Sequence, residues 1–141
     1  MQTSARNQFP GVVHHIQTGV VTDEVQIHTS GGATLVATIT HGSAQTLGLK
    51  AGSAVIALIK APSVIVVTDA QGMRFSARNQ LAGTVTAVKT GSVNSEVQID
   101  SQGLQVVAIV TNDSATALGL APGTPATALF KASHVVLAVP A

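Results

Sequence analysis

Cysteine, tryptophan and tyrosine are absent from this chain of 141 residues, phenylalanine occurs three times, and charged residues make up only 9%. The lack of cysteine excludes disulfides, thiolate metal sites and cysteine nucleophiles. A single-stranded nucleic acid needs a basic groove with aromatic stacking platforms, so a net charge of +1 with few aromatics argues against that partner. The sequence has no run of eighteen apolar residues and no basic start followed by an apolar stretch. We therefore expect no membrane-spanning helix and a cytoplasmic location.

An internal repeat is the strongest positive feature of the sequence. The pentapeptide Ser-Ala-Arg-Asn-Gln at residues 4–8 recurs letter for letter at residues 76–80. The segments that follow also match, first seventy-two positions apart and, beyond Ser30, seventy-one apart, because the second copy is one residue shorter. The chain is therefore two copies of one small unit. A hydrophobic core tolerates many residue combinations, whereas an identical polar string points to function.

The two copies define the expected domains, residues 1–69 and 74–141, with a short linker from about Asp69 to Phe75. A unit of about seventy residues buries only roughly 60% of its unfolded surface and is marginally stable alone. Hydrophobic residues make up 45% of the sequence, and few charges are available to cover a surface. We therefore expect the units to pack on each other and the chain to form a homo-oligomer.

Each copy reads mainly as β-strand. β-branched residues and polar–apolar alternation indicate short strands, expected in the first copy at residues 11–17, 24–28, 35–40, 53–59 and 64–68. The segment from Ser43 to Leu49 indicates a short helix, with Ser43 as its cap and Gly48 near its end. Five strands with a helix between the third and the fourth predict an all-β fold, as two tandem OB-fold-like five-stranded barrels.

Three features of the sequence carry a family resemblance. They are the repeated pentapeptide, the Thr-x-x-Ser step at Thr40 and Ser43 before Leu-Gly-Leu, and the late Lys60-Ala61 pair. They resemble the signature of the molybdate-binding Mop-type domain, and nearly the whole chain, taken twice, is similar to a di-Mop molbindin. The resemblance implies an OB-like fold, a homotrimer of chains, and molybdate or tungstate held between domains. It implies an oxyanion ligand, no cofactor and no free metal cation.

The residue types suit such a ligand. Molybdate is a tetrahedral dianion with acceptor oxygens only, so the site must offer hydroxyls, N–H groups and one or two cations. A helix start adds N–H groups and the positive end of a dipole. The molybdate-binding residues expected from the family match are Ser4, Ala5, Arg6, Asn7, Thr40, Ser43 and Lys60, with Ser76, Ala77, Arg78, Asn79, Thr111, Ser114 and Lys131 in the second copy. Because the motif is repeated, we expect two equivalent sites. No catalytic residue is expected, since no Ser-His-Asp or paired-carboxylate arrangement repeats.

Structural roles compete for several of these residues. Arg6 and Arg78 can instead pair with Glu24 or Glu96, which are the one repeated acid. The two threonines fit ordinary strand positions, and the two serines fit helix caps. The two lysines fall at one repeat position in a chain with few lysines, which favours a ligand role.

The five histidines predict no metal site, because none recurs in the other copy. His14 and His15 are adjacent, and in a regular strand they would point to opposite faces. We expect the histidines at the surface or at an interface.

Together these features predict a non-enzymatic protein that binds, stores and delivers molybdate or tungstate inside the cell. The alternative is a ligand-sensing regulatory module that acts through a protein partner. Similar domains occur in transcription regulators and transporter ATPases, but this sequence has no helix-turn-helix or nucleotide-binding segment.

Overall fold

The computed structural model describes all 141 residues, and its elements follow the repeat. The first copy contains β1 (Asn7–Gln17), β2 (Thr22–Thr29), β3 (Thr34–Thr40), α1 (His41–Thr46), β4 (Ala54–Ile59), the 3₁₀ turn η1 (Ala61–Ser63) and β5 (Ile65–Val67). The second contains β6 (Asn79–Thr90), β7 (Asn94–Ser101), β8 (Leu104–Thr111), α2 (Asn112–Ala117), β9 (Pro125–Phe130), η2 (Ala132–His134) and β10 (Val136–Ala138). The predicted all-β, OB-fold-like order of five strands and one helix per copy is confirmed.

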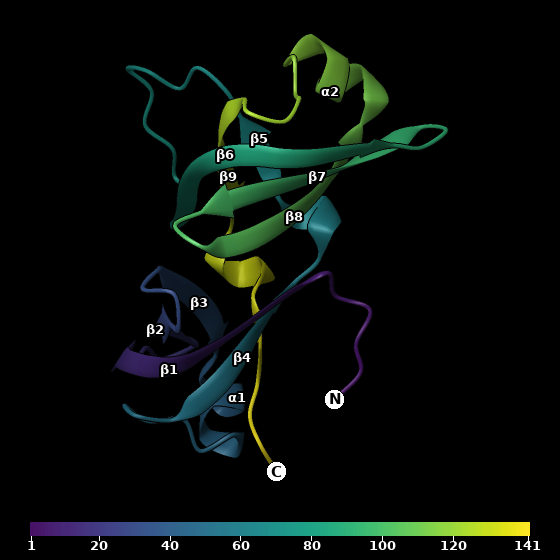
Figure 1. Cartoon of the computed structure of the whole chain (residues 1–141). Helices are drawn as coiled ribbons and strands as arrows, with labels where there is room; N and C mark the ends of the chain where they lie inside the picture. The colour runs from purple at the N-terminus through teal and green to yellow at the C-terminus, as the bar shows by residue number, and fades with distance from the viewer.

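The two copies exchange their last strands. The strand orders are β10-β4-β1-β2-β3 in one sheet and β5-β9-β6-β7-β8 in the other, with every pairing antiparallel. In Figure 1 the chain leaves β4 and enters the other lobe to form β5, and the C-terminal segment returns to run beside β4. Each five-stranded sheet is therefore built from four strands of one copy and the fifth strand of the other.

The exchange places both copies around one core. The buried hydrophobic residues form a continuous cluster of 25 side chains drawn from both halves of the chain, including Phe9 and Ile59 from the first and Leu81 and Phe130 from the second. Val66 of β5 and Leu137 of β10 belong to the same cluster. The expectation from the short linker, that the copies pack together, is thus confirmed.

Each long first strand carries a β-bulge at the same repeat position. The pairing register shifts between Val13 and His15 in β1, and between Val85 and Ala87 in β6. A bulge inserts one extra residue and breaks the alternation of faces. The prediction that His14 and His15 point to opposite faces is therefore wrong, because both side chains are exposed. The His14 ring stacks on that of His28 on the neighbouring strand, with centroids 4.1 Å apart.

The residues that cap the two short helices are the same in both copies. Thr40 is the N-cap of α1, and its Oγ accepts the Ser43 backbone N–H at 3.1 Å, so Ser43 is the third helical residue and not the cap that we expected. Gly48 ends the helix with φ of 63°, as predicted. Neither α1 nor α2 is long and apolar enough to cross a lipid bilayer.

Candidate functional site

The asparagines of the two pentapeptides tie the copies together. The Asn7 side-chain amide donates to the Val107 carbonyl at 2.8 Å and accepts the Val107 N–H at 2.7 Å. Asn79 makes the same pair of bonds with Val36, both at 2.8 Å. Asn7 and Asn79 are only 1% and 2% exposed. The amide oxygen and one amide N–H of each asparagine thus serve the edge of the other copy's third strand, and the use of the asparagine as a ligand donor stays a prediction.

The pentapeptide arginines also reach across to the other copy. Arg6 donates from Nη1 and Nη2 to the two carboxylate oxygens of Glu96, at 2.6 and 2.9 Å. Arg78 donates from Nη1 to Glu24 at 2.6 Å. Pairing of the two arginines with Glu24 and Glu96 was the structural alternative to a ligand role that the sequence allowed. The hydrogen bonds from Arg6 lower the pKa of Glu96, and the same bonds raise the pKa of Arg6.

A polar pocket of about 200 Å³ lies against the second pentapeptide. We call it the Arg78 pocket, and its lining residues are Thr38, Ser76, Ala77, Arg78, Lys131, Ala132 and Ser133. It brings together four of the predicted site residues of the second copy, and it contains no acidic residue. Sequence reasoning missed Thr38 and Ser133, although Ser133 follows Lys131 by only two residues.

The two site lysines stand at matching places in the fold. Lys60 and Lys131 follow the last residues of β4 and β9 and precede the turns η1 and η2. Both are exposed, and neither has a carboxylate within 4.0 Å. In the Arg78 pocket, where Arg78 is already paired with Glu24, Lys131 is therefore the cation whose charge is not neutralised by a neighbouring acid.

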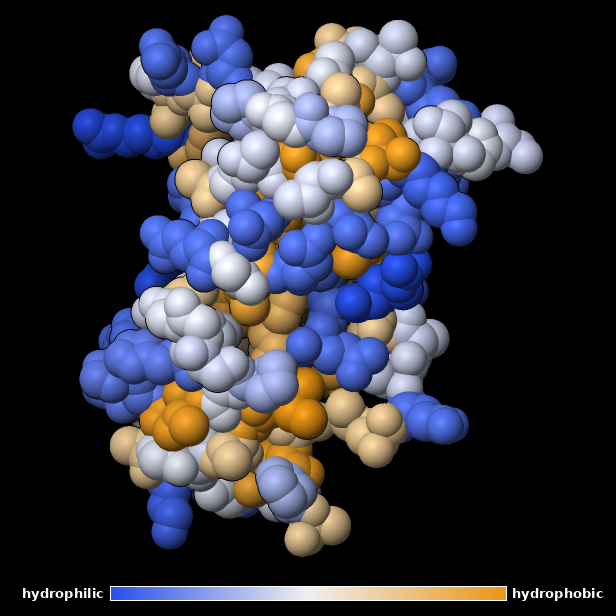
Figure 2. All heavy atoms as spheres, viewed as in Figure 1, coloured by the Kyte–Doolittle hydropathy of each residue, from blue (hydrophilic) through white to orange (hydrophobic).

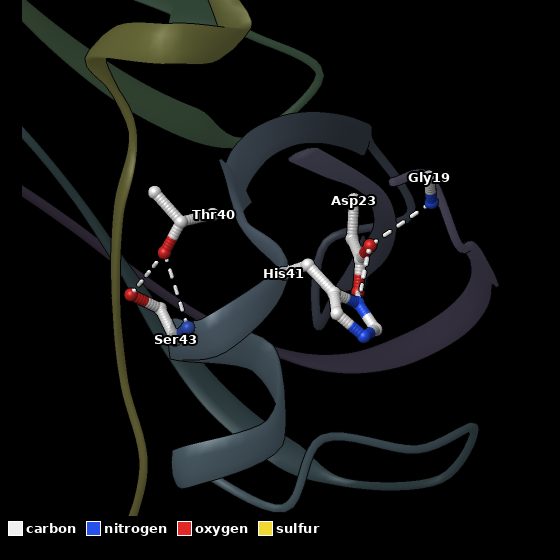
Figure 3. A network of polar contacts seen from close by, with 5 residues as sticks. All are labelled: Gly19, Asp23, Thr40, His41 and Ser43. Atoms are coloured by element: carbon white, nitrogen blue, oxygen red, sulfur yellow. Dashed lines mark hydrogen bonds and ion pairs between the residues drawn. The ribbon is translucent and has the colours of Figure 1, made fainter. Parts of the chain in front are cut away.

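The predicted hydroxyl pair of each copy lies outside this pocket. Thr40 Oγ donates to Ser43 Oγ at 2.7 Å, and Thr111 makes the equivalent bond to Ser114 at 2.8 Å. Figure 3 shows Thr40 and Ser43 facing each other at the start of α1. All four residues are exposed, but none of them lines the Arg78 pocket. Within one chain, the structure does not bring these hydroxyls to the pentapeptide.

A second polar network lies beside the start of α1, and only in the first copy is it built from an acid and a histidine. The buried Asp23 carboxylate accepts the Gly19 N–H at 3.0 Å and contacts His41 Nδ1 at 3.0 and 3.1 Å (Figure 3). The corresponding pair in the second copy is Ser95 and Asn112, joined at 2.6 Å. Alternation in β2 could have located Asp23, since it shares the inward face with Val25 two residues later. Both pairs fasten the start of the helix to the neighbouring strand.

Comparison with known proteins agrees with this architecture. The TOBE domain model matches residues 3–66 and again residues 76–137. The chain is 49% identical over 140 residues to the molybdenum transport protein ModE of Herbaspirillum seropedicae, and 46% identical over 141 residues to the molybdenum-pterin-binding protein MopA of Rhodobacter capsulatus. In each case 99% of this chain is covered, but only 52% and 53% of the relative. The chain thus spans about half the length of these curated relatives.

One solved structure is similar over its whole length. It is a crystal structure, with molybdate bound, of a protein described as the cytoplasmic molybdate-binding protein ModG. The TM-score is 0.96 at 47% sequence identity, and the match covers 99% of this chain and 100% of that one.

Proposed function

The chain belongs to the TOBE domain family in both of its repeats, and from this premise we propose that it binds molybdate or tungstate reversibly, as an intracellular carrier or store and not as an enzyme. The Arg78 pocket is the observation that carries the proposal. Two cationic side chains and three hydroxyl-bearing residues line a small cavity that contains no acid. Such a lining offers hydrogen-bond donors to a ligand that can only accept them. Support also comes from the relatives, whose names refer to molybdenum and molybdate.

We further propose which groups hold the oxyanion. In the second copy the oxyanion is bound by Ser76, Ala77, Arg78 and Lys131. In the first copy it is bound by the corresponding residues Ser4, Ala5, Arg6 and Lys60. Asn7 and Asn79 hold the pentapeptide in place through the strand of the other copy. The other four predicted residues, Thr40, Ser43, Thr111 and Ser114, are exposed. We propose that their hydroxyls reach a ligand when a second copy of the chain packs over the pocket.

Surface composition supports a homo-oligomer. Val12, Ile65 and Val136 are exposed on strands, and Val20, Val21 and Val93 are exposed on turns. In Figure 2 hydrophobic residues reach the surface in both halves of the molecule, with hydrophilic residues gathered between them. Exposed sheet edges and apolar residues call for a covering partner.

We expect the protein to be a stable homotrimer. Sedimentation equilibrium at micromolar concentration should give three times the chain mass of 14.2 kDa. A monomer under these conditions would contradict both the assembly and the idea that a second copy supplies hydroxyls to the site.

The ligand preference should follow oxyanion size. Molybdate and tungstate are expected to bind more tightly than sulfate or phosphate, because the shorter bonds of the smaller ions leave some donors unmet. Each unmet buried donor costs about 1–3 kcal/mol, which is roughly five- to a hundred-fold in affinity. Calorimetric titrations with the four ions test this, and equal affinity for sulfate would contradict the proposed ligand.

Lys60→Ala and Lys131→Ala are each expected to weaken molybdate binding at their own site. A hydrogen bond to a charged partner contributes about 1.5–3 kcal/mol, so each loss should lower affinity by about ten- to a hundred-fold. The assembly should persist, because both lysines are exposed. Lys50→Ala removes the same charge from an exposed position away from the pocket and is the matched control. Unchanged affinity in Lys131→Ala, or a dissociated assembly, would remove lysine from the ligand set.

A further inference from the structure

We propose that the two repeat-related sites of each chain are not equivalent: the Arg78 pocket is the tight site, and the corresponding site at the first pentapeptide, which we call the Arg6 site, is the weak one. This inference rests on the proposed function, and it replaces the equivalence that the repeat predicted. The two sites differ in four ways, and each difference favours tighter oxyanion binding in the Arg78 pocket.

The first difference lies on the third strand of the opposite copy. In the β2–β3 pairing, Glu24 stands opposite Thr38, and Thr38 lines the Arg78 pocket. In the β7–β8 pairing, Glu96 stands opposite Ile109. The same register therefore presents a hydroxyl donor beside Arg78 and a hydrocarbon side chain beside Arg6.

The second difference lies in the turn that follows each lysine. η2 begins with Ala132 and Ser133, and η1 begins with Ala61 and Pro62. Ser133 lines the Arg78 pocket, and a serine carries both a hydroxyl and a backbone N–H. Proline has neither group, so the Arg6 site lacks both of these donors at that position.

The third difference concerns the pentapeptide backbone. The Ala5 N–H donates to the Thr3 hydroxyl at 3.1 Å, within the chain itself. The residue that corresponds to Thr3 in the second copy is Phe75, whose side chain cannot accept a hydrogen bond. No protein acceptor takes up the Ala77 N–H, which lies in the lining of the Arg78 pocket. This backbone donor is thus available to a ligand in the second copy and occupied in the first.

The fourth difference is how firmly each guanidinium is held by its acid. Arg6 makes two hydrogen bonds to Glu96, whereas Arg78 makes one to Glu24. A bidentate pair fixes the guanidinium in a single orientation and occupies more of its donors. Arg78 therefore keeps more N–H groups free to turn toward an anion in the pocket.

These differences predict two classes of molybdate sites in one titration. A hydrogen bond to a charged group changes affinity by about ten-fold or more, so the classes should lie at least about ten-fold apart. Lys131→Ala should abolish or weaken the tight class, and Lys60→Ala should affect the weak class alone.

The test is an exchange of the distinguishing side chains, followed by calorimetric titration with sodium molybdate. The loss variant combines Thr38→Val with Ser133→Ala, and we expect it to weaken the tight class by about ten-fold or more. The gain variant combines Ile109→Thr with Pro62→Ser, and it should tighten the weak class toward the tight one. The gain variant decides the question if the loss variant fails to fold, and thermal unfolding of each variant shows whether the fold is kept.

The outcomes separate this inference from the function on which it rests. Two classes that respond as described support it. One class of identical sites, or a tight class removed by Lys60→Ala, would overturn the inequivalence and leave molybdate binding intact. The absence of any molybdate binding in the wild-type protein would overturn the proposed function, and the inference with it.

Discussion

Deleting residues 136–141 is expected to destabilise the sheet of the first copy, although these residues lie at the far end of the chain. They include β10, which pairs with Ile56, Ala57 and Leu58 of β4 and buries Leu137. Removing a core leucine side chain alone costs about 2–5 kcal/mol, and the deletion also opens the β4 edge. Urea unfolding should show this loss, and amide hydrogen exchange should speed up in β4 more than in β9.

The control for this deletion removes only the last two residues. Pro140 and Ala141 are exposed and lie beyond β10, so their loss should change the free energy of unfolding by no more than about 0.5 kcal/mol. If the longer deletion instead exposed β9 and left β4 protected, each sheet would be completed by its own copy, and the strand exchange would be wrong.

Asn7→Ala is expected to cost about 2–6 kcal/mol of unfolding free energy, because it leaves two buried backbone groups without partners at about 1–3 kcal/mol each. The groups are the N–H and the carbonyl of Val107, which is itself buried. Asn79→Ala should act likewise through Val36. Denaturant titration of the two single variants measures these losses.

Asn94→Ala is the matched control, since Asn94 is exposed in the structure and its replacement should stay within about 0.5 kcal/mol. The experiment also separates the two roles proposed for the asparagine. If Asn7→Ala kept its stability and lost molybdate affinity, the amide would be a ligand donor, as the sequence alone suggested.

The sequence predicted the elements well because the local signals were strong. The alternation from Glu24 to His28 and the segment from Ser43 to Leu49 located β2 and α1 within a few residues. The bulge at His14 was not predictable, since an extra residue in a strand leaves no local signature in a β-branched stretch. The strand exchange was hidden for a different reason. Because the two copies have similar sequences, β5 could pair equally well with β4 of its own copy or with β9 of the other. The hydrophobic pattern of the sequence does not distinguish the two pairings.

The candidate site was predicted in part. The first three residues of the second pentapeptide and Lys131 line one pocket. Asn7 was predicted as a ligand because it belongs to a repeated polar string, and its structural bonds to Val107 were not foreseen. The alternation of Asn7 with Phe9, which is buried, was the available signal that its side chain points inward. Thr38 was missed because it comes from the other copy, and only the three-dimensional packing brings it to Ser76 and Arg78.

The exchanged strands change how the halves of the molecule respond to dilution. A chain with a single repeat would leave one sheet edge unfilled, and filling it from a second copy would be a bimolecular reaction governed by mass action. Here the residues around Gly72 join the partners covalently, and a short flexible linker gives an effective concentration on the order of millimolar. The pairing of the two repeats is therefore independent of how much protein a cell contains, whereas the homotrimer that we propose would form only at sufficient protein concentration.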